Sequence, residues 1–248
     1  MSIKHFLSTA WRLVPVLILA GCQGASDSSS GDSAGNVGCE GGGDAANTAC
    51  YQVQLVGQWK AADHGALPGG AHFTSPVIAS HSDAYSLFKA GESYASAGLE
   101  LLAERGKTAT LINEMAGDNG VKCRTTMSGF SSPTAQASAN ITLTTSHALI
   151  SLASMVAPTP DWFLGVGGLS VLDEAGAFRD DLSADVHTYD AGTEEGSGFS
   201  LSNAATEPPE AVDYLSPSGT GFTSQSSERI EPPLARVTLT KISDGSCP

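Results

Sequence analysis

Three carboxylates stand in two short acidic turns that each adjoin a strand-like run. Asp161 follows two prolines, which hold the backbone extended, and it opens the alternating run of residues 162–172. Asp190 closes the run of residues 182–189, and Glu194 follows across a glycine that permits a tight turn. Carboxylates on one rim repel one another unless a cation lies between them, and Ca²⁺ accepts about six to eight oxygen ligands. The pattern predicts a calcium site of Asp161, Asp190 and Glu194, completed by main-chain carbonyls and water.

These acids also admit interpretations that need no metal. Asp is common at strand ends because its side chain caps turns. Paired acids can flank a sugar bond in a glycoside hydrolase, but Asp190 and Glu194 stand so close on one turn that they favour chelation of a cation. We therefore expect a protein that is not an enzyme, with no catalytic residues and no organic cofactor.

His64, His72 and His81 lie in a loop-rich stretch and raise the possibility of a zinc site or a hydrolase. Their spacing fits no compact zinc-ligand pattern, and histidines in loops more often form hydrogen bonds to backbone. No Gly-x-Ser-x-Gly motif is present in the segment expected to fold, residues 50–243. A secreted hydrolase with its site in the loops from His72 to Tyr85 is the alternative function, and a pocket that holds a histidine of shifted pKa beside a nucleophile would identify it.

The N-terminal residues indicate export to a cell envelope. Lys4 and Arg12 are basic, residues 13–20 are apolar, and the sequence Leu-Ala-Gly before Cys22 resembles the lipobox of bacterial lipoproteins. We expect a lipoprotein signal peptide over residues 1–21 and acylation of Cys22. By resemblance to that class, Gln23 favours the outer membrane of a bacterial cell envelope.

Residues 22–49 are mostly small and polar, which predicts a flexible Gly/Ser-rich tether. Loss of the signal peptide leaves ten basic against twenty-six acidic side chains, a net charge of about −16 at neutral pH. The phosphate backbone of nucleic acid would be repelled by this charge, so nucleic acid is excluded as a partner. The lipid anchor is then the only expected membrane contact.

Four cysteines besides Cys22 predict two disulfides in an oxidising compartment. Cys50 precedes the first strand-like run and Cys247 follows the last, so these two meet if the terminal strands pair antiparallel. Cys39 would then pair with Cys123. Four cysteines allow three pairings, and the other two stay open. The absence of a Cys-x-x-Cys motif disfavours structural zinc.

Alternation of apolar and polar residues dominates from Tyr51 onward and predicts half-buried strands. We expect strands at residues 51–59, 108–115, 139–145, 162–172, 182–189 and 235–242, separated by turn-forming clusters, in one all-β sandwich or barrel. Residues 96–105 form the one convincing helical pattern. Gly165, inside a strand, is expected to let another backbone or an aromatic ring pack closely. Trp162 is expected to be a core anchor rather than a ligand platform.

Five motifs in order resemble the spondin N-terminal domain family, and the resemblance covers most of residues 51–242. The motifs are His72-Phe73-Ser75-Pro76, Ser80-His81 with Tyr85-Ser86-Leu87-Phe88, Gly98-Leu99 to Leu102-Ala103-Glu104, Pro160-Asp161-Trp162-Phe163 with Gly165-Val166, and Tyr189-Asp190-Ala191-Gly192-Thr193-Glu194.

This resemblance implies a C2-like antiparallel β-sandwich over residues 50–243, with one or two short crossover helices. It also implies calcium bound by loops at one end and a role in adhesion through an unknown extracellular protein or glycan. The chain departs from the family pattern at Glu194, where Asp is usual. A polysaccharide- or lipid-binding module without metal is the remaining alternative, which exposed aromatic platforms would distinguish.

Overall fold

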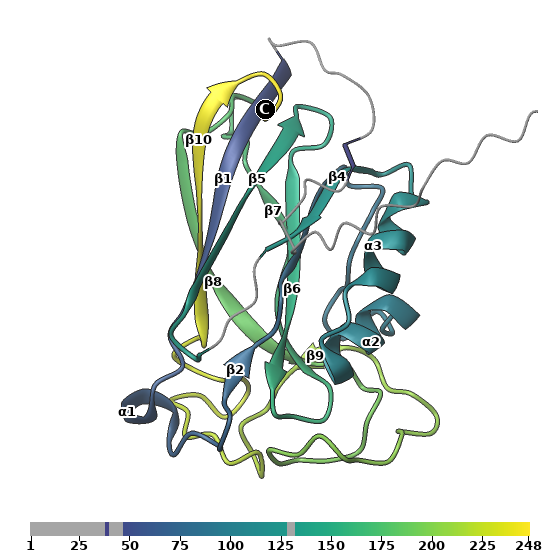
Figure 1. The fold of residues 1–248 in the computed structure, drawn as a ribbon, viewed down its shortest axis with the longest axis vertical. Coiled ribbons are helices and arrows are strands. Elements are labelled where there is room, and N and C mark those ends of the chain that lie inside the picture. The colour runs from purple at the N-terminus through teal and green to yellow at the C-terminus, as the bar shows by residue number, and fades with distance from the viewer. Residues whose placement is uncertain (1–37, 40–46, 128–131) are drawn as a thin grey trace, which may run out of the picture. The chain divides into compact units, whose positions relative to one another are not determined.

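The computed structural model describes residues 38–39, 47–127 and 132–248 (Figure 1). The predicted signal peptide, Cys22 and most of the predicted tether lie outside the described residues. Among the helices that the structure describes, none combines the length and apolar character that a membrane crossing requires.

Antiparallel strands dominate the described part of the chain and short helices interrupt them. The elements are β1 (Thr48–Gly57), α1 (Ala61–His64), β2 (His72–Phe73), β3 (Val77–His81), α2 (Ala97–Arg105), α3 (Ala109–Ala116), β4 (Val121–Thr126), β5 (Gln136–Thr144), β6 (Leu149–Ala157), β7 (Trp162–Ser170), β8 (Asp181–Asp190), β9 (Asp213–Tyr214) and β10 (Ala235–Asp244).

The strands form two facing layers joined by β8: the first sheet contains β1, β5 and β10, and the second sheet contains β3, β4, β6 and β7. They pair in the order β4-β3-β6-β7-β8-β10-β1-β5, with β2 beside β6 and β9 beside β8. Residues 181–186 of β8 pair with β10, whereas residues 187–190 pair with β7, so this strand passes from one layer to the other. Figure 1 shows both layers, with α2 and α3 covering the outer side of the layer that contains β6. The predicted antiparallel β-sandwich with short helices is confirmed.

Two hydrophobic clusters account for this arrangement. The larger lies between the sheets and includes Trp59, Leu152 and Trp162. The smaller packs α2 and α3 onto the second sheet and includes Leu102 and Phe163. Gly165 is one contact point in that layer, since a Cβ there would lie 2.6 Å from the Phe88 ring. The expected close approach of an aromatic ring at this glycine is therefore confirmed.

The alternating pattern located five of the ten described strands and missed the other five, among them the two-residue strands β2 and β9. The observed β1, β5, β7, β8 and β10 match expected strands, while β3, β4 and β6 were not predicted. Every residue of β3 is buried, and so is every residue of β6 after the first. These strands belong to the second sheet, and both faces of that sheet are covered, one by the first sheet and the other by α2 and α3. Burial on both faces removes the alternation on which the prediction depends.

The strand expected at residues 108–115 is wrong, because this segment forms α3. Leu111, Ile112 and Met115 are its buried residues. Their spacing of one and three residues places them on a single helical face, which packs in the smaller cluster.

Helix α2 begins and ends as its sequence predicts. The Ser96 hydroxyl accepts the Leu99 N–H at 3.2 Å, and Gly106 takes the left-handed conformation at φ 64°. Glu114 of α3 adds a second cap, since its carboxylate accepts the Gly98 N–H at 2.8 Å and the Ser96 hydroxyl at 2.6 Å. A carboxylate at a helix N-terminus is favourable because the helix dipole is positive there.

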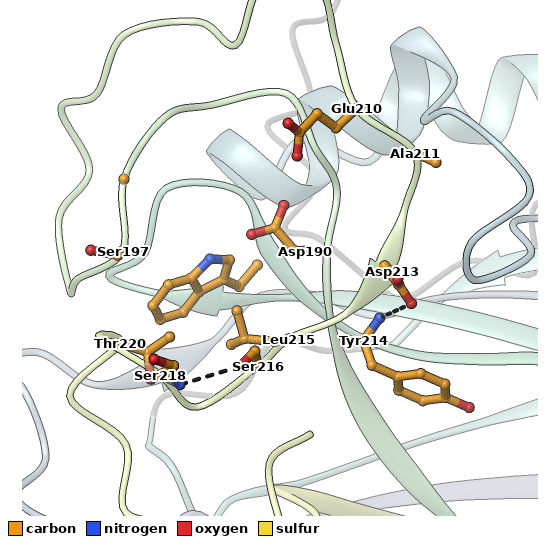
Figure 2. A pocket seen from close by; sticks show the side chains of 12 residues that line it. Asp190, Ser197, Glu210, Ala211, Asp213, Tyr214, Leu215, Ser216, Ser218 and Thr220 are labelled. Carbon is orange, nitrogen blue, oxygen red and sulfur yellow. Dashed lines mark hydrogen bonds between the residues drawn. The ribbon is translucent and has the colours of Figure 1, made fainter. Parts of the chain in front are cut away.

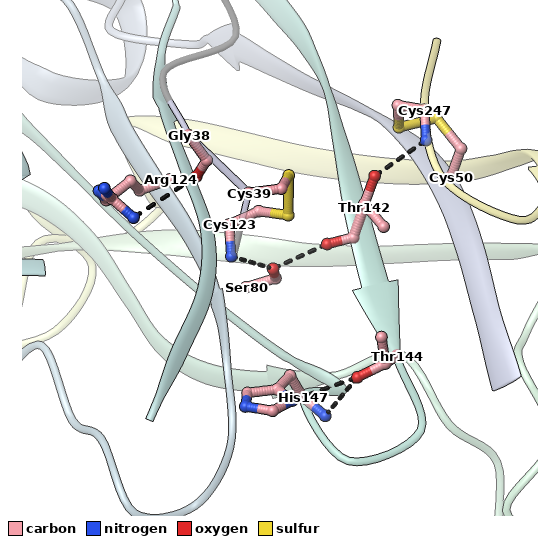
Figure 3. The surroundings of a disulfide bond; sticks show 10 residues. All are labelled: Gly38, Cys39, Cys50, Ser80, Cys123, Arg124, Thr142, Thr144, His147 and Cys247. Atoms are coloured by element: carbon pink, nitrogen blue, oxygen red, sulfur yellow. Dashed lines mark hydrogen bonds between the residues drawn. A yellow bond between two sulfur atoms is a disulfide. The ribbon is translucent and has the colours of Figure 1, made fainter. Parts of the chain in front are cut away.

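Two disulfides join Cys39 to Cys123 and Cys50 to Cys247 (Figure 3). The favoured pairing is confirmed, and for the reason given, since β1 and β10 lie side by side in antiparallel register. The backbone N–H of Cys247 also donates to the Thr142 hydroxyl on β5 at 2.9 Å. The end of the chain is thus attached to two strands of the first sheet.

Candidate functional site

The pairing of β7 with β8 brings two of the predicted ligands together. Trp162, which opens β7, lies opposite Asp190, which closes β8. Asp161 directly precedes this pair, and its carbonyl accepts the Ala191 N–H at 3.2 Å. The two acidic turns therefore lie at the same end of the sandwich, as the strand pattern indicated.

Asp161 is a fully buried acid with one oxygen satisfied and the other not. Its Oδ2 accepts the Thr193 N–H at 2.7 Å, the Thr193 hydroxyl at 3.3 Å and the Glu194 N–H at 3.1 Å. Its Oδ1 has no hydrogen-bond partner in the described structure. Burial raises the pKa of Asp161 to about 6, the charge of Asp190 adds to the increase, and the bonds from Thr193 and Glu194 oppose it. A buried carboxylate oxygen without a partner is the kind of atom that a bound cation would satisfy.

Asp190 lies on a turn that only glycine allows. Its Oδ1 accepts the Gly192 N–H at 2.8 Å. Gly192 has φ 71°, and a Cβ there would lie 2.5 Å from the Glu210 carbonyl oxygen. Burial is the main cause that raises the pKa of Asp190; the Gly192 N–H and the Trp162 side chain lower it, and the charges of Glu210 and Asp213 raise it further.

Glu194 lies in the turn after β8, next to Asp161, but its carboxylate contacts Arg105 and Asn203 instead of the two aspartates. Its Oε1 lies 3.5 Å from an Arg105 guanidinium nitrogen, and its Oε2 accepts the Asn203 amide at 3.2 Å. Its contribution to the site here is the backbone N–H that binds Asp161. To ligate a cation beside Asp161, the Glu194 side chain would have to turn away from Arg105.

Within the part of the chain that the structure describes, no group of three or more His, Cys, Asp or Glu side chains is arranged to hold a metal ion. Asp161 and Asp190 nevertheless fit a hard cation, because a buried and a partly buried carboxylate interact there and one oxygen lacks a partner. The fit of Glu194 requires the rearrangement described above. The three-residue calcium site therefore stays a prediction.

A cavity of about 280 Å³ lies beside Asp190 (Figure 2). Three acids, two aromatic rings and several hydroxyl groups share its wall. The lining residues are Trp162, Asp190, Gly196, Ser197, Glu210, Ala211, Asp213, Tyr214, Leu215, Ser216, Ser218 and Thr220. We call this cavity the acidic pocket. Sequence reasoning missed Glu210 and Asp213, because β9 is two residues long and shows no period.

The strand β9 positions one wall of the acidic pocket. It pairs with the end of β8, which sets Asp213 opposite Asp190 and Tyr214 opposite Tyr189. The rings of the two tyrosines stack with centroids 4.8 Å apart. This pairing places two like charges directly across from each other, an arrangement that is unfavourable without a neutralising partner.

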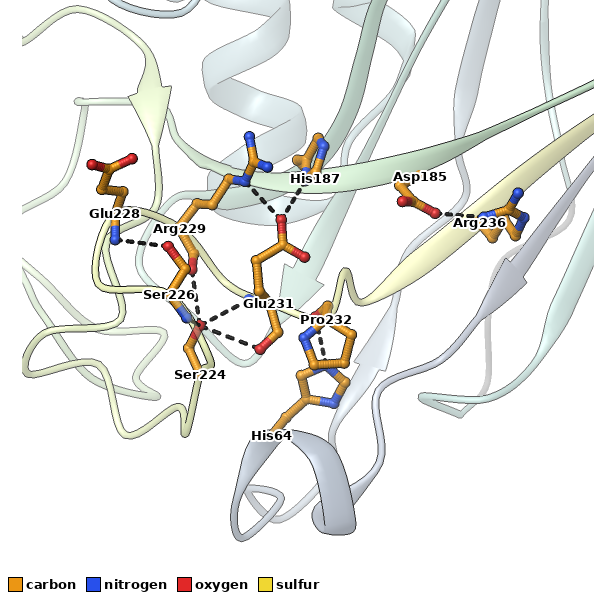
Figure 4. Close-up of polar contacts among 10 residues, drawn as sticks. All are labelled: His64, Asp185, His187, Ser224, Ser226, Glu228, Arg229, Glu231, Pro232 and Arg236. Carbon is orange, nitrogen blue, oxygen red and sulfur yellow. Dashed lines mark hydrogen bonds and ion pairs between the residues drawn. The ribbon is translucent and has the colours of Figure 1, made fainter.

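A polar network holds the loop of residues 224–231 (Figure 4), which contacts Tyr214 through Arg229. The Arg229 guanidinium lies 5.6 Å from the Tyr214 ring centroid and donates to Glu231 at 2.7 Å. Ser224 donates to the Arg229 carbonyl at 2.9 Å and accepts the Glu231 N–H at 2.8 Å. Tyr214 is therefore fixed on both faces, by Tyr189 and by Arg229.

The three histidines considered as zinc ligands instead contact backbone carbonyls. The contacts are His64 to Pro232 at 2.8 Å, His72 to Gly70 at 2.6 Å, and His81 to Ser82 at 2.7 Å. The expectation that they serve as loop hydrogen-bonding groups is confirmed.

For the hydrolase alternative, the structure offers the histidine–serine pair of His81 and Ser151, but both residues are buried and a substrate cannot reach them. The His81 Nε2 lies 2.8 Å from the Ser151 hydroxyl, and burial lowers the pKa of His81. Ser151 is fully buried, and its oxygen also accepts the Gly168 N–H at 2.9 Å. The cavity of about 350 Å³ at His72 has no serine or cysteine among its described lining residues. A nucleophile that substrate cannot reach does not support acyl transfer.

Comparison with known proteins places these features in a family. The sequence model of the Spondin_N family matches residues 49–230. Human Spondin-2 is 32% identical over 205 residues, which cover 77% of this chain and 61% of the relative. Rat Spondin-2 is 31% identical over the same coverage. Rat Spondin-1 is 27% identical over 177 residues, which cover 68% of this chain and 22% of the relative. The chain thus spans less than two thirds of the length of these relatives.

Proposed function

Because the chain belongs to the spondin N-terminal family, we propose that it is a non-enzymatic, calcium-binding module for adhesion or recognition outside the cell. The observation that carries the calcium proposal is the unpartnered Oδ1 of buried Asp161 beside Asp190. The recognition proposal is supported by the family and by the loops that gather at this end of the sandwich.

The residues of the site would act by ordering the loops. Asp161 already fixes the turn after β8 through the backbone of Thr193 and Glu194. Its charge and that of Asp190 oppose this arrangement, since Asp161 is buried, Asp190 is partly buried, and the pKa of each is raised. Calcium would supply two positive charges that neutralise them. The turn would then be held in a single shape that a partner can recognise.

Calcium titration of the chelator-treated full chain tests the proposal. We expect saturable binding with a Kd on the order of 0.1 to 1 mM, as in other extracellular modules. At roughly 10 mM calcium this corresponds to about 1.4 to 2.7 kcal/mol of added stability. Isothermal calorimetry and melting temperature measure the two quantities.

Three variants assign the ligands. Asp190→Asn should abolish the calorimetric signal, and Glu194→Gln should weaken binding roughly tenfold if its carboxylate turns to the ion. The exposed strand residue Asp181 provides the control Asp181→Asn, which should bind as wild type. Unchanged calcium binding in Asp190→Asn would refute the site, whereas an effect of Asp190→Asn without one of Glu194→Gln would restrict it to the two aspartates.

We also propose that Cys22 carries a lipid anchor in a bacterial outer membrane, on the basis of the lipobox-like sequence before it. Expression in a bacterial host should place the chain in the detergent phase of a Triton X-114 extraction and incorporate labelled palmitate. Cys22→Ala should lose both properties. Labelling that persists in Cys22→Ala would contradict acylation at this residue.

A further inference from the structure

Arg105 ends α2 and places a positive charge beside the predicted ligand Glu194. Its guanidinium nitrogens lie 3.5 Å from Glu194 Oε1 and 3.8 Å from Glu104 Oε2. The side chains of Glu194 and Glu104 are only 6% and 12% exposed, whereas that of Arg105 is 56% exposed. One accessible guanidinium therefore offsets the charge of two carboxylates that are largely removed from water.

The contacts of Arg105 and those of Asp161 meet in the turn after β8. Glu194 donates its backbone N–H to Asp161 Oδ2 at 3.1 Å, while its side chain reaches Arg105. The Thr193 hydroxyl donates to the same Asp161 oxygen at 3.3 Å. Burial raises the pKa of Glu104, the Thr193 side chain lowers it, and the charge of Glu194 raises it further. The buried acid and the exposed guanidinium are thus connected through two adjacent residues of one turn.

The Glu194 carboxylate can serve Arg105 or a cation at Asp161, but not both. Its Oε1 faces Arg105, and its Oε2 accepts the Asn203 amide at 3.2 Å. Asp161 Oδ1 is fully buried and has no hydrogen-bond partner in the described structure, so a cation there would gain from a second carboxylate. By turning to that cation, Glu194 would exchange the single charge of Arg105 for the double charge of calcium.

Arg105 can release Glu194 without disturbing its helix. It lines the cavity of about 350 Å³ at His72, which leaves its side chain room to move. A cation at the C-terminal end of α2 is also favourable by itself, because the helix dipole is negative there. An ion pair with one accessible partner is weak, so calcium can displace it.

We propose that Arg105 competes with calcium for the Glu194 carboxylate and thereby sets the calcium affinity of the site. Without calcium, Arg105 holds the carboxylate away from Asp161. With calcium, the carboxylate turns to the ion and Arg105 is released from the turn. This inference rests on the proposed calcium site and names its regulation.

The test is a calorimetric calcium titration of the full chain as wild type, Arg105→Gln, Glu194→Gln and the double variant. A salt concentration of about 0.15 M screens exposed charges more than about 8 Å apart. Arg105→Gln should lower the Kd roughly two- to fivefold, which is the effect expected from loss of one such ion pair. In the Glu194→Gln background the same substitution should have no effect, because the carboxylate for which Arg105 competes is gone.

Lys107→Gln is the matched control, since it removes the same charge from an exposed residue two positions further on and should leave the Kd unchanged. Nuclear magnetic resonance of the Arg105 Nε–H gives a second measurement. Calcium should shift this resonance in the wild type and leave it in place in Glu194→Gln. Unaltered far-ultraviolet circular dichroism shows that the variants fold.

Equal or weaker calcium binding by Arg105→Gln would overturn the inference. A lower Kd that persists in the Glu194→Gln background would also overturn it, because it would reveal a long-range charge effect in place of competition. Both results can occur while the wild type binds calcium, so they leave the proposed site intact. Absence of calcium binding in both the wild type and Arg105→Gln would instead refute the site and the inference together.

Discussion

Asp161→Asn is expected to raise the free energy of unfolding of the calcium-free protein at pH 7 by about 3 kcal/mol and to remove its response to calcium. A pKa near 6 against the ordinary 3.8 corresponds to that energy. The charge is costly because the group is buried beside Asp190. The amide keeps an oxygen to accept from Thr193 and Glu194, and its NH₂ group occupies the position of the unpartnered Oδ1.

The pH dependence of this difference follows from the direction of the shift. Because the folded pKa is raised, the folded state binds the proton more tightly between pH 3.8 and about 6. Stability contributed by Asp161 is therefore lost as pH rises through this window, and the loss is complete above it. The free energies of unfolding of the wild-type protein and of Asp161→Asn should be nearly equal at about pH 4 and differ most at pH 7.

Urea unfolding of both proteins in EDTA, from pH 4 to pH 8, measures this difference. The pKa values of His81 and His187 are lowered by burial, so they reduce stability as pH falls below 6.5, but they do so in both proteins. The difference between the two free energies of unfolding at each pH therefore reports the contribution of Asp161 alone. A variant that is less stable than wild type at pH 7, or that still responds fully to calcium, would contradict the role given to this carboxylate.

Removal of the Cys50–Cys247 disulfide is expected to lower the free energy of unfolding by about 5 kcal/mol. The bond joins residues 197 positions apart, and a cross-link over a loop of this length removes much entropy from the unfolded chain. The double variant Cys50→Ala and Cys247→Ala avoids placing a hydroxyl at Cys50, which is fully buried. Chemical denaturation under non-reducing conditions gives the value.

The second disulfide provides the matched control. Cys39 and Cys123 are 84 positions apart, so the chain-entropy model predicts that their removal costs roughly 0.8 kcal/mol less. Removal of Cys50–Cys247 with a loss below about 1 kcal/mol would mean that the paired strands β1 and β10 alone confine the chain ends. The m-value should be compared as well, because loss of a cross-link makes the unfolded state more expanded.

The sequence alone was sufficient to predict the strands that are partly exposed to solvent. β1, β5, β7, β8 and β10 each border solvent along part of their length, so apolar and polar residues alternate and reveal them. Helix α2 was predictable because its caps, Ser96 and Gly106, are local signals. The favoured disulfide pairing was predictable because two cysteines flank the terminal strands.

The candidate site was partly predictable for a similar reason. Asp161 and Asp190 occupy adjoining strand ends, and antiparallel pairing then requires them to meet. The direction of the Glu194 carboxylate was not predictable, because it depends on Arg105 and Asn203, which come from other segments.

Tertiary structure alone decided the features that depend on contacts between distant segments. β3 and β6 lack alternation because the sheets and helices cover both of their faces, and α3 is helical because Leu111, Ile112 and Met115 pack as one face in the smaller cluster. The acidic pocket exists because the loop after Gly192 returns and pairs β9 with β8, which brings Asp213 opposite Asp190. The pairing of β9 with β8 depends on packing across the whole domain, so neither the periodicity nor the spacing of residues in the sequence predicts it.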